Sequence, residues 1–170
     1  MKKILLSLLT SFFFISTVHA QEVADESEDI GTSSLPRMVS IRSNKVNSRS
    51  GPGTRYPIVW VYLQRNEPVE IVNEFEFWRK IKDWQGSESW VHKSMLSSKR
   101  TAKVITAGEN NIYLKDNRDS KVIAKVEDEA VGEVKRCPEK SKFCLVKFGN
   151  IEGWLPRASL FGIYPEEHIN

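Results

Sequence analysis

Short runs of β-branched and aromatic residues alternate with turn-forming residues from Met38 to the end of the chain. Such runs fill residues 58–63, 69–71, 77–81 and 89–91, and stretches with glycine, proline or asparagine separate them. No window in this part of the chain sustains the apolar spacing of an amphipathic helix over three turns. The pattern therefore predicts an all-β protein whose short strands form small barrels or sandwiches.

The segment from Phe77 to Trp84 divides into two faces, because successive side chains of a strand point to opposite sides. Phe77 and Ile81 share the face that suits the core. The opposite face holds two tryptophans and two lysines, namely Trp78, Lys80, Lys82 and Trp84. Aromatic rings interleaved with cations can stack on sugars or bases and attract anions, so these four are candidate ligand-binding residues. The alternative is that a loop or a second barrel covers the tryptophans.

The chain also repeats its own pattern. Residues 68–72, 78–81 and 89–96 correspond to residues 130–134, 143–146 and 153–160. Two tandem barrels are therefore expected, the first over residues 38–100 and the second over residues 101–170. The join between Leu96 and Val104 is short and lacks glycine and proline. We expect the two barrels to pack against each other because a barrel of this size is marginally stable alone.

The first 20 residues have the features of a secretory signal peptide. Lys2 and Lys3 precede an apolar stretch, and small residues before Gln21 suit a cleavage site. Residues 21–37 are acidic, lack aromatic residues and lack periodicity, so they are expected to form a disordered leader. We therefore expect a bacterial protein exported by the Sec route to the periplasm or beyond, with no membrane span after cleavage.

The net charge of +3 over 170 residues conceals an uneven distribution. Residues 41–100 hold 11 basic and 6 acidic side chains, whereas residues 101–170 hold 11 of each. The sequence has only three histidines, and it offers no phosphate loop, no nucleophile–base pair and no metal-ligand spacing. We expect no metal, no cofactor and no enzymatic activity.

The two cysteines, Cys137 and Cys144, both lie after the signal peptide. An even number of cysteines in an oxidising compartment favours a disulfide. Zinc binding is disfavoured because no second pair of cysteines or histidines completes four ligands. The expected disulfide would join two adjacent strands, at residues 131–136 and 144–148.

The most specific motif is V-N-S-R-S-G-P-G-T-R-Y-P at residues 46–57, a strand that ends in a turn. Gly51 and Gly53 flank a proline, and glycine allows positive φ on either side of it. With the closing stretch G-S-E-S-W-V at residues 86–91, the chain resembles the bacterial SH3-like (SH3b) family, except that Ser89 replaces the second glycine. The second repeat has lost the Gly-Pro-Gly turn but keeps E-G-W-L-P at residues 152–156, so it is a degenerate copy.

This resemblance implies two partly open SH3-like barrels and a binding role rather than catalysis. Bacterial members of the family often recognise cell-wall peptides or target a hydrolase to its substrate. Arg49 and Tyr56 in the motif, and His92 after the closing strand, join the candidate ligand-binding residues. Trp90 and Trp154 stand beside aliphatic residues on short strands, and we expect both in the core.

The leading hypothesis is a non-catalytic secreted or periplasmic module that binds a peptidoglycan peptide, a glycan or another envelope component. The first repeat would bind it, in a cleft between residues 49–56 and residues 84–92. The alternative is a protein–protein interaction or structural protein of the cell envelope with no small ligand. Nucleic acid does not fit the compartment, and the sequence does not predict the oligomeric state.

Overall fold

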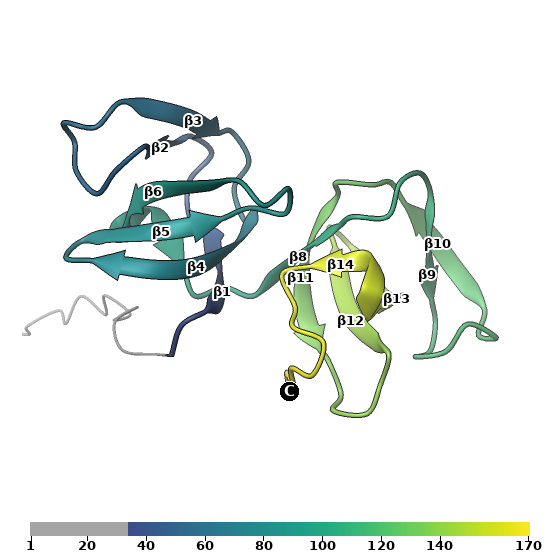
Figure 1. The fold of residues 1–170 in the computed structure, drawn as a ribbon. Helices are drawn as coiled ribbons and strands as arrows, with labels where there is room; N and C mark the ends of the chain where they lie inside the picture. The colour runs from purple at the N-terminus through teal and green to yellow at the C-terminus, as the bar shows by residue number, and fades with distance from the viewer. Residues whose placement is uncertain (1–33) are drawn as a thin grey trace, which may run out of the picture.

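The computed structural model describes residues 34–170, so the predicted signal peptide and most of the predicted acidic leader lie outside the described residues. The described part of the chain is all β, as the sequence predicts, with two short 3-10 helices. It forms two barrels that lie side by side, one coloured purple to teal and the other green to yellow (Figure 1). Within residues 34–170, no helix is long and apolar enough to cross a membrane.

Each barrel consists of seven strands and one 3-10 helix. The first contains β1 (Arg37–Ile41), β2 (Val46–Arg49), β3 (Ile58–Tyr62), β4 (Pro68–Phe75), β5 (Trp78–Lys82), β6 (Glu88–His92), η1 (Lys93–Met95) and β7 (Leu96–Ser97). The second contains β8 (Thr101–Val104), β9 (Asn110–Tyr113), β10 (Val122–Val126), β11 (Val131–Arg136), β12 (Phe143–Phe148), β13 (Ile151–Pro156), η2 (Arg157–Ser159) and β14 (Leu160–Phe161).

The two sheets have the same topology. The strand order is β3-β2-β6-β5-β4-β1-β7 in the first sheet and β10-β9-β13-β12-β11-β8-β14 in the second. Each strand of the second sheet thus occupies the same place as the strand of the first sheet whose number is lower by seven, so that β8 corresponds to β1 and β14 to β7. The three pairs of segments that correspond in sequence lie on equivalent elements of the two barrels. The first pair lies on β4 and β11, and the second on β5 and β12. The third runs from β6 to β7 in the first barrel and from β13 to β14 in the second.

The core of each barrel is aliphatic. Ile81 and Val91 are fully buried in the first barrel, as are Val146 and Leu155 in the second. The prediction that Trp90 and Trp154 belong to these cores is wrong, because both are only half-buried. Each tryptophan directly precedes a buried aliphatic residue on its strand, so the pleat turns the indole to the outer face.

The predicted disulfide between Cys137 and Cys144 is present. It closes the turn between β11 and β12, which pair in an antiparallel ladder, as expected. Cys137 also pairs with Ile169 in an isolated bridge, which holds the C-terminal segment against this turn. The disulfide therefore anchors both the hairpin and the end of the chain.

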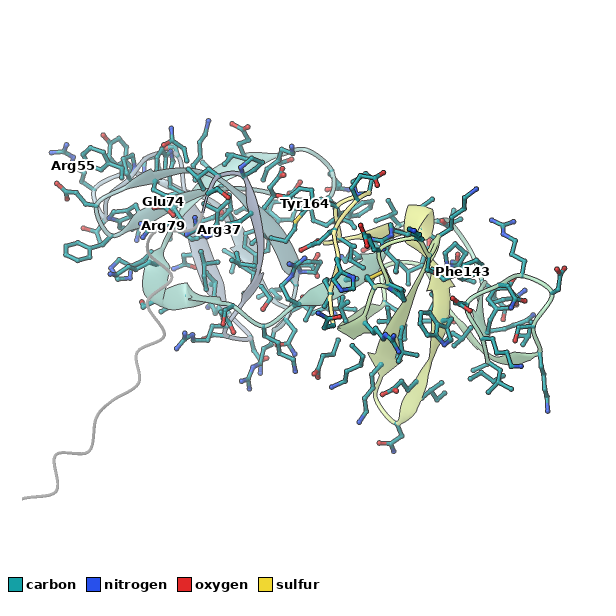
Figure 2. The ribbon with its side chains drawn as sticks, turned by 90° about the horizontal axis from the view of Figure 1, so that it is seen from below. Arg37, Arg55, Glu74, Arg79, Phe143 and Tyr164 are labelled. Carbon is teal, nitrogen blue, oxygen red and sulfur yellow. A yellow bond between two sulfur atoms is a disulfide. The ribbon has the colours of Figure 1, made fainter. Side chains whose placement is uncertain are left out.

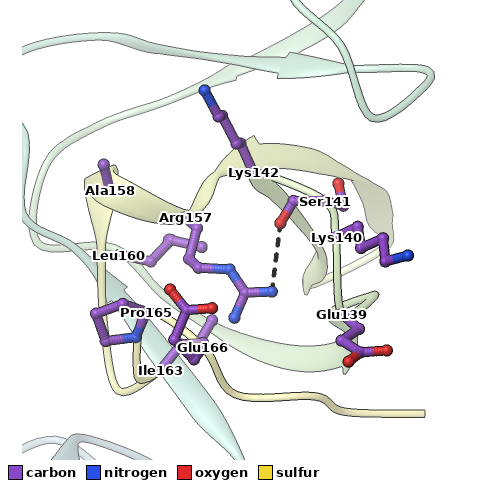
Figure 3. Close-up of a pocket in the computed structure, with 10 residues that line it drawn as sticks. All are labelled: Glu139, Lys140, Ser141, Lys142, Arg157, Ala158, Leu160, Ile163, Pro165 and Glu166. Atoms are coloured by element: carbon purple, nitrogen blue, oxygen red, sulfur yellow. Dashed lines mark hydrogen bonds between the residues drawn. The ribbon is translucent and has the colours of Figure 1, made fainter.

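A cavity of about 690 Å³ lies between the disulfide turn and the C-terminal segment (Figure 3). The guanidinium of Arg157 spans it, donating to the carbonyl oxygens of Tyr164 at 3.1 Å and Glu167 at 2.7 Å. Its other terminal nitrogen donates to the carbonyl oxygens of Pro138 at 3.2 Å and Ser141 at 3.4 Å. Because backbone carbonyls take both terminal nitrogens, we assign Arg157 a structural role.

We expect the double substitution Cys137→Ala/Cys144→Ala to lower the free energy of unfolding of the second barrel by about 2–3 kcal/mol. The disulfide closes a short loop, and its loss restores conformational freedom to the unfolded chain. Urea titration of the purified chain with and without reductant provides the measurement. A reductant that leaves the midpoint of the oxidised wild type unchanged would contradict the prediction.

The two barrels pack against each other, as the short join predicts. The Thr101 hydroxyl donates to the carbonyl oxygen of Asn66 at 2.7 Å. The Tyr164 hydroxyl donates to a carboxylate oxygen of Glu70 at 2.9 Å, and Figure 2 shows Tyr164 between the two barrels. Lys103 forms a buried ion pair with Glu67 at 2.8 Å. We call this region, where β8 and the C-terminal segment meet β4 and the preceding turn, the barrel junction.

Candidate functional site

The loop between β2 and β3 is built around Tyr56. Arg49 donates from one guanidinium nitrogen to the carbonyl oxygens of Thr54 at 3.0 Å and Tyr56 at 2.7 Å, which fixes the loop in place. A Cβ atom on Gly51 would lie 2.5 Å from the Tyr56 ring, so only glycine lets the ring pack here. Neither Gly51 nor Gly53 adopts the positive φ that glycine allows. The motif needs Gly51 to make room for the aromatic ring.

We expect Gly51→Ala to displace the Tyr56 ring and to destabilise the first barrel by about 1–3 kcal/mol, the usual cost of overpacking. Gly53→Ala is the matched control, because its Cβ would meet the same ring at an ordinary 3.4 Å. Thermal melts of both variants check the prediction. Equal melting temperatures for the two variants would argue against it.

Strands β5 and β6 present an outer face of aromatic and basic side chains. Trp78 pairs across the ladder with His92, and Lys80 pairs with Trp90. Arg49 on β2 pairs with Trp90 from the other side, so the loop motif and this face are continuous. The rings of Trp78 and His92 meet edge to face with centroids 5.7 Å apart. We call these five residues the outer face.

Two phenylalanines extend the outer face. Phe75 pairs with Trp78 across the ladder and is half exposed. Phe77 is 58% exposed, and its ring stacks on His92 with centroids 6.1 Å apart. The prediction that Phe77 shares the core face with Ile81 is wrong, because Phe77 lies in the turn before β5, where the alternation of a strand no longer applies. Sequence analysis therefore missed Phe75, Phe77 and Trp90 as surface residues.

Carboxylates from neighbouring residues neutralise part of the basic charge near this face. Lys80 forms an ion pair with Glu88 on β6. Lys82 pairs with Glu70 at 2.8 Å, and this hydrogen bond raises the pKa of the lysine. Arg49 remains directed at the loop carbonyls, so the outer face is more aromatic than cationic.

His92 has a structural contact as well as a place in the outer face. Its Nδ1 accepts from the backbone N–H of Ser94 at 3.3 Å and lies 2.7 Å from the Ser94 hydroxyl, which caps the start of η1. The ring is thereby held against Phe77 and Trp78. No group of three or more histidine, cysteine or acidic side chains within residues 34–170 has the geometry to hold a metal ion.

The prediction that Trp84 belongs to the same stripe as Trp78 does not hold. Strand β5 ends at Lys82, and Trp84 lies in the following turn, next to the barrel junction. The ammonium of Lys103 from the second barrel lies 5.2 Å from the centroid of its ring. The sequence left open that the second barrel covers the two tryptophans. The second barrel contacts Trp84 in this way, whereas Trp78 lies on the outer face.

Six of the seven candidate residues separate into two groups, and the seventh, Lys82, forms its ion pair with Glu70. Arg49, Tyr56, Trp78, Lys80 and His92 lie on or beside the outer face. Trp84 contributes instead to a cavity at the barrel junction, whose lining also includes part of β3. A ring array with peripheral cations can stack on sugar rings or apolar peptide side chains and hold anionic groups weakly. The outer face is therefore suited to bind such a ligand.

Comparison with solved structures gives distant matches, two of which follow. NlpC1 and NlpC2 from Trichomonas vaginalis are similar to this chain at 13% and 14% identity, and the TM-score is 0.34 for each. Each match covers 76% of this chain. The chain spans 46% of NlpC1 and 49% of NlpC2, about half their length. No curated protein matches the chain.

The family comparison concerns the first barrel. A family model described as the bacterial SH3 domain matches residues 42–98. The matched range runs from the end of β1 to η1 and β7, and it includes the loop motif and the whole outer face. Residues 42–98 of this chain are therefore a bacterial SH3 domain, and the resemblance in sequence is confirmed for this barrel.

Proposed function

We propose that this chain is a non-catalytic binding module of the bacterial cell envelope that binds peptidoglycan through the outer face of its first barrel. The observation that carries the proposal is the continuous row of Phe75, Trp78 and His92 beside Trp90 and Arg49. Aromatic rings are costly to leave half exposed, and such rows are typical of surfaces that stack on ligands.

The disulfide and the family of the first barrel support an extracytoplasmic location. Disulfides persist in oxidising compartments and are rare in the cytosol. The apolar stretch of residues 1–20 favours export in the same way, although it lies outside the described residues. Bacterial SH3 domains are typical of proteins that act at the cell wall, and the described part of the chain includes one.

A binding role also agrees with the chemistry of the outer face. Its titratable side chains are engaged: Lys80 with Glu88, and His92 with Ser94. Catalysis requires a nucleophile or a base directed at a substrate, and these contacts supply neither. That the chain is not an enzyme stays a prediction.

Sedimentation with purified bacterial sacculi tests the proposal. The purified chain is expected to pellet with sacculi and to stay in the supernatant without them. Sacculi stripped of stem peptides by an amidase separate peptide from glycan recognition. If the chain stays in the supernatant with intact sacculi, the proposal is wrong, and the alternative of an envelope protein as partner takes its place.

A further inference from the structure

A second cavity, of about 390 Å³, lies at the barrel junction and away from the outer face. Aromatic side chains from the first barrel form much of its wall: Trp60 and Tyr62 from β3, and Trp84 from the turn after β5. The second barrel adds Lys103 and Glu129. The cavity therefore exists only when the two barrels are packed together.

The charge around this cavity is not balanced. Three carboxylates line it, those of Glu67, Asp83 and Glu129, against the single ammonium of Lys103. Lys103 is already shared, since it lies 2.8 Å from Glu67 and 3.6 Å from Glu129 and also sits over the Trp84 ring. One cation thus lies among three carboxylates, of which Glu67 is almost fully buried, and this excess of negative charge attracts a further cation.

Glu67 gives the most direct sign of a missing partner. The residue is only 5% exposed, and Lys103 binds its Oε1 atom. Its Oε2 atom is buried and has no hydrogen-bond partner among residues 34–170. A buried acceptor without a donor is costly. Burial raises the pKa of Glu67, and the nearby Glu129 and Asp83 raise it as well, so a bound cation would stabilise the ionised form.

The neighbouring buried carboxylate, Glu70, has hydrogen-bond partners for both of its oxygens. It is 7% exposed, yet its two oxygens accept from Tyr164 at 2.9 Å and from Lys82 at 2.8 Å. Glu70 does not line the cavity. Of these two buried carboxylates, Glu67 is the one that lines the cavity and the one with an oxygen that has no hydrogen-bond partner among residues 34–170.

Strand β3 leads away from this cavity and is one of the two terminal strands of the first sheet. Ile58, Val59 and Trp60 are each about half exposed along it. A smaller cavity of about 240 Å³ lies beside β3 and extends to Ser89. Trp60 and Tyr62 line both this cavity and the cavity at the barrel junction. An unpaired strand edge with exposed apolar side chains is suited to pair with an extended peptide.

We propose that the cavity at the barrel junction binds the primary ammonium group of a peptide that extends along β3. The ammonium donates to Glu67 Oε2 and lies among the rings of Trp60 and Trp84, and the peptide backbone pairs with the edge of β3. Charge complementarity selects a cation, the aromatic wall favours it further, and the free strand edge favours a peptide over a small amine. The site is independent of the outer face.

The test uses the purified chain and the tripeptide acetyl-Ala-Lys-Ala-amide, followed by tryptophan fluorescence and by the indole N–H signals of Trp60 and Trp84 in nuclear magnetic resonance. We expect saturable binding and shifts of these two signals. The same peptide with an acetylated lysine ammonium is expected not to bind, and n-butylammonium is expected to bind more weakly. Equal binding of the acetylated peptide refutes the cation site, and equal binding of n-butylammonium refutes the role of β3.

Glu67→Gln is expected to weaken binding of the tripeptide roughly tenfold or more, which is the loss of affinity expected when a hydrogen bond to a charged group is removed. Glu70→Gln is the matched control and should leave the affinity unchanged. Trp60 is 59% exposed on an edge strand, so Trp60→Ala should fold normally, and we expect it to weaken binding roughly three- to thirtyfold. Unchanged affinity in Trp60→Ala overturns the proposal even if Glu67→Gln fails to fold.

Trp78→Ala separates this site from the proposed function. The indole lies on the outer face and does not line the cavity. We expect the variant to bind the lysine tripeptide like the wild type. Loss of tripeptide binding in Trp78→Ala would place the ammonium on the outer face and contradict the proposal.

Discussion

Replacing Lys103 with methionine is expected to lower the free energy of unfolding by about 3–5 kcal/mol, the cost of leaving one partner of a buried ion pair without the other. Both side chains of the pair are almost fully buried, at 6% exposure for Lys103 and 7% for Glu67. The substitution keeps the length of the side chain but removes its charge. Glu67 then loses the ammonium that pairs with its Oε1 atom, and the Trp84 ring also loses its cation.

The double variant Glu67→Gln/Lys103→Met provides the control for this prediction. Removal of both charges avoids an isolated buried ion, and such pairs can often be replaced at little net cost. We expect the double variant to recover most of the stability that Lys103→Met loses. Urea titrations of the wild type, of Lys103→Met, of Glu67→Gln and of the double variant give the coupling energy between the two residues. A double variant that is as unstable as Lys103→Met would show that packing rather than charge holds the junction.

The destabilisation of Lys103→Met should also depend on pH. Burial raises the pKa of Glu67 in the folded protein above its ordinary value even with Lys103 present. The stability linked to such a carboxyl group is fully present below its unfolded pKa and is lost as the pH rises through the folded pKa. Without Lys103 the pKa rises further. The variant should therefore approach the wild type in stability as the pH falls into the range where Glu67 is protonated.

Strands, repeats and packing of the barrels could be predicted from the sequence because they depend on local periodicity. The alternation in residues 78–81 and 89–91 and its recurrence in the second half predicted the strands and the tandem repeat, and the short join predicted the packing. The disulfide followed from cysteine count and compartment. These features need no knowledge of distant contacts.

The tryptophans show where local periodicity fails. Trp90 was expected in the core because it stands beside aliphatic residues on a short strand. Its neighbour Val91 occupies the core instead, and the alternation of the strand directs Trp90 to the other face. Trp84 was expected on the stripe because the period of two was continued beyond Lys82, where β5 ends. Hydrophobicity alone does not select the inner face, since β6 has an apolar residue on each face, Trp90 and Val91.

The charges of the barrel junction could not be found from the sequence either. Glu67 follows a turn of the first barrel, and Lys103 lies 36 residues later on the first strand of the second. Nothing local marks either residue as buried. Only the packing of the two barrels brings them together and removes them from water, so the cavity that they line is a property of the pair of barrels.

The outer face gives the second large effect. We expect Trp78→Ala and Trp90→Ala each to weaken sacculus binding by about 1–3 kcal/mol, by analogy with aromatic platforms that stack on bases. Because both indoles are half-buried on the outer face, each variant should lose only about 1 kcal/mol or less of stability through its cross-strand neighbours. This reverses the expectation for Trp90 as a core residue.

Two further variants make the comparison decisive. Ile81→Ala empties a fully buried site in the same sheet and should cost about 2–5 kcal/mol, so its binding loss would follow unfolding. Trp154→Ala removes the equivalent indole of the second barrel, which lies outside the matched SH3 range, and should leave sacculus binding unchanged. Thermal melts and sedimentation curves are measured for all four variants. If Trp90→Ala unfolds like Ile81→Ala, or Trp154→Ala loses binding like Trp78→Ala, the outer face of the first barrel is not the binding surface.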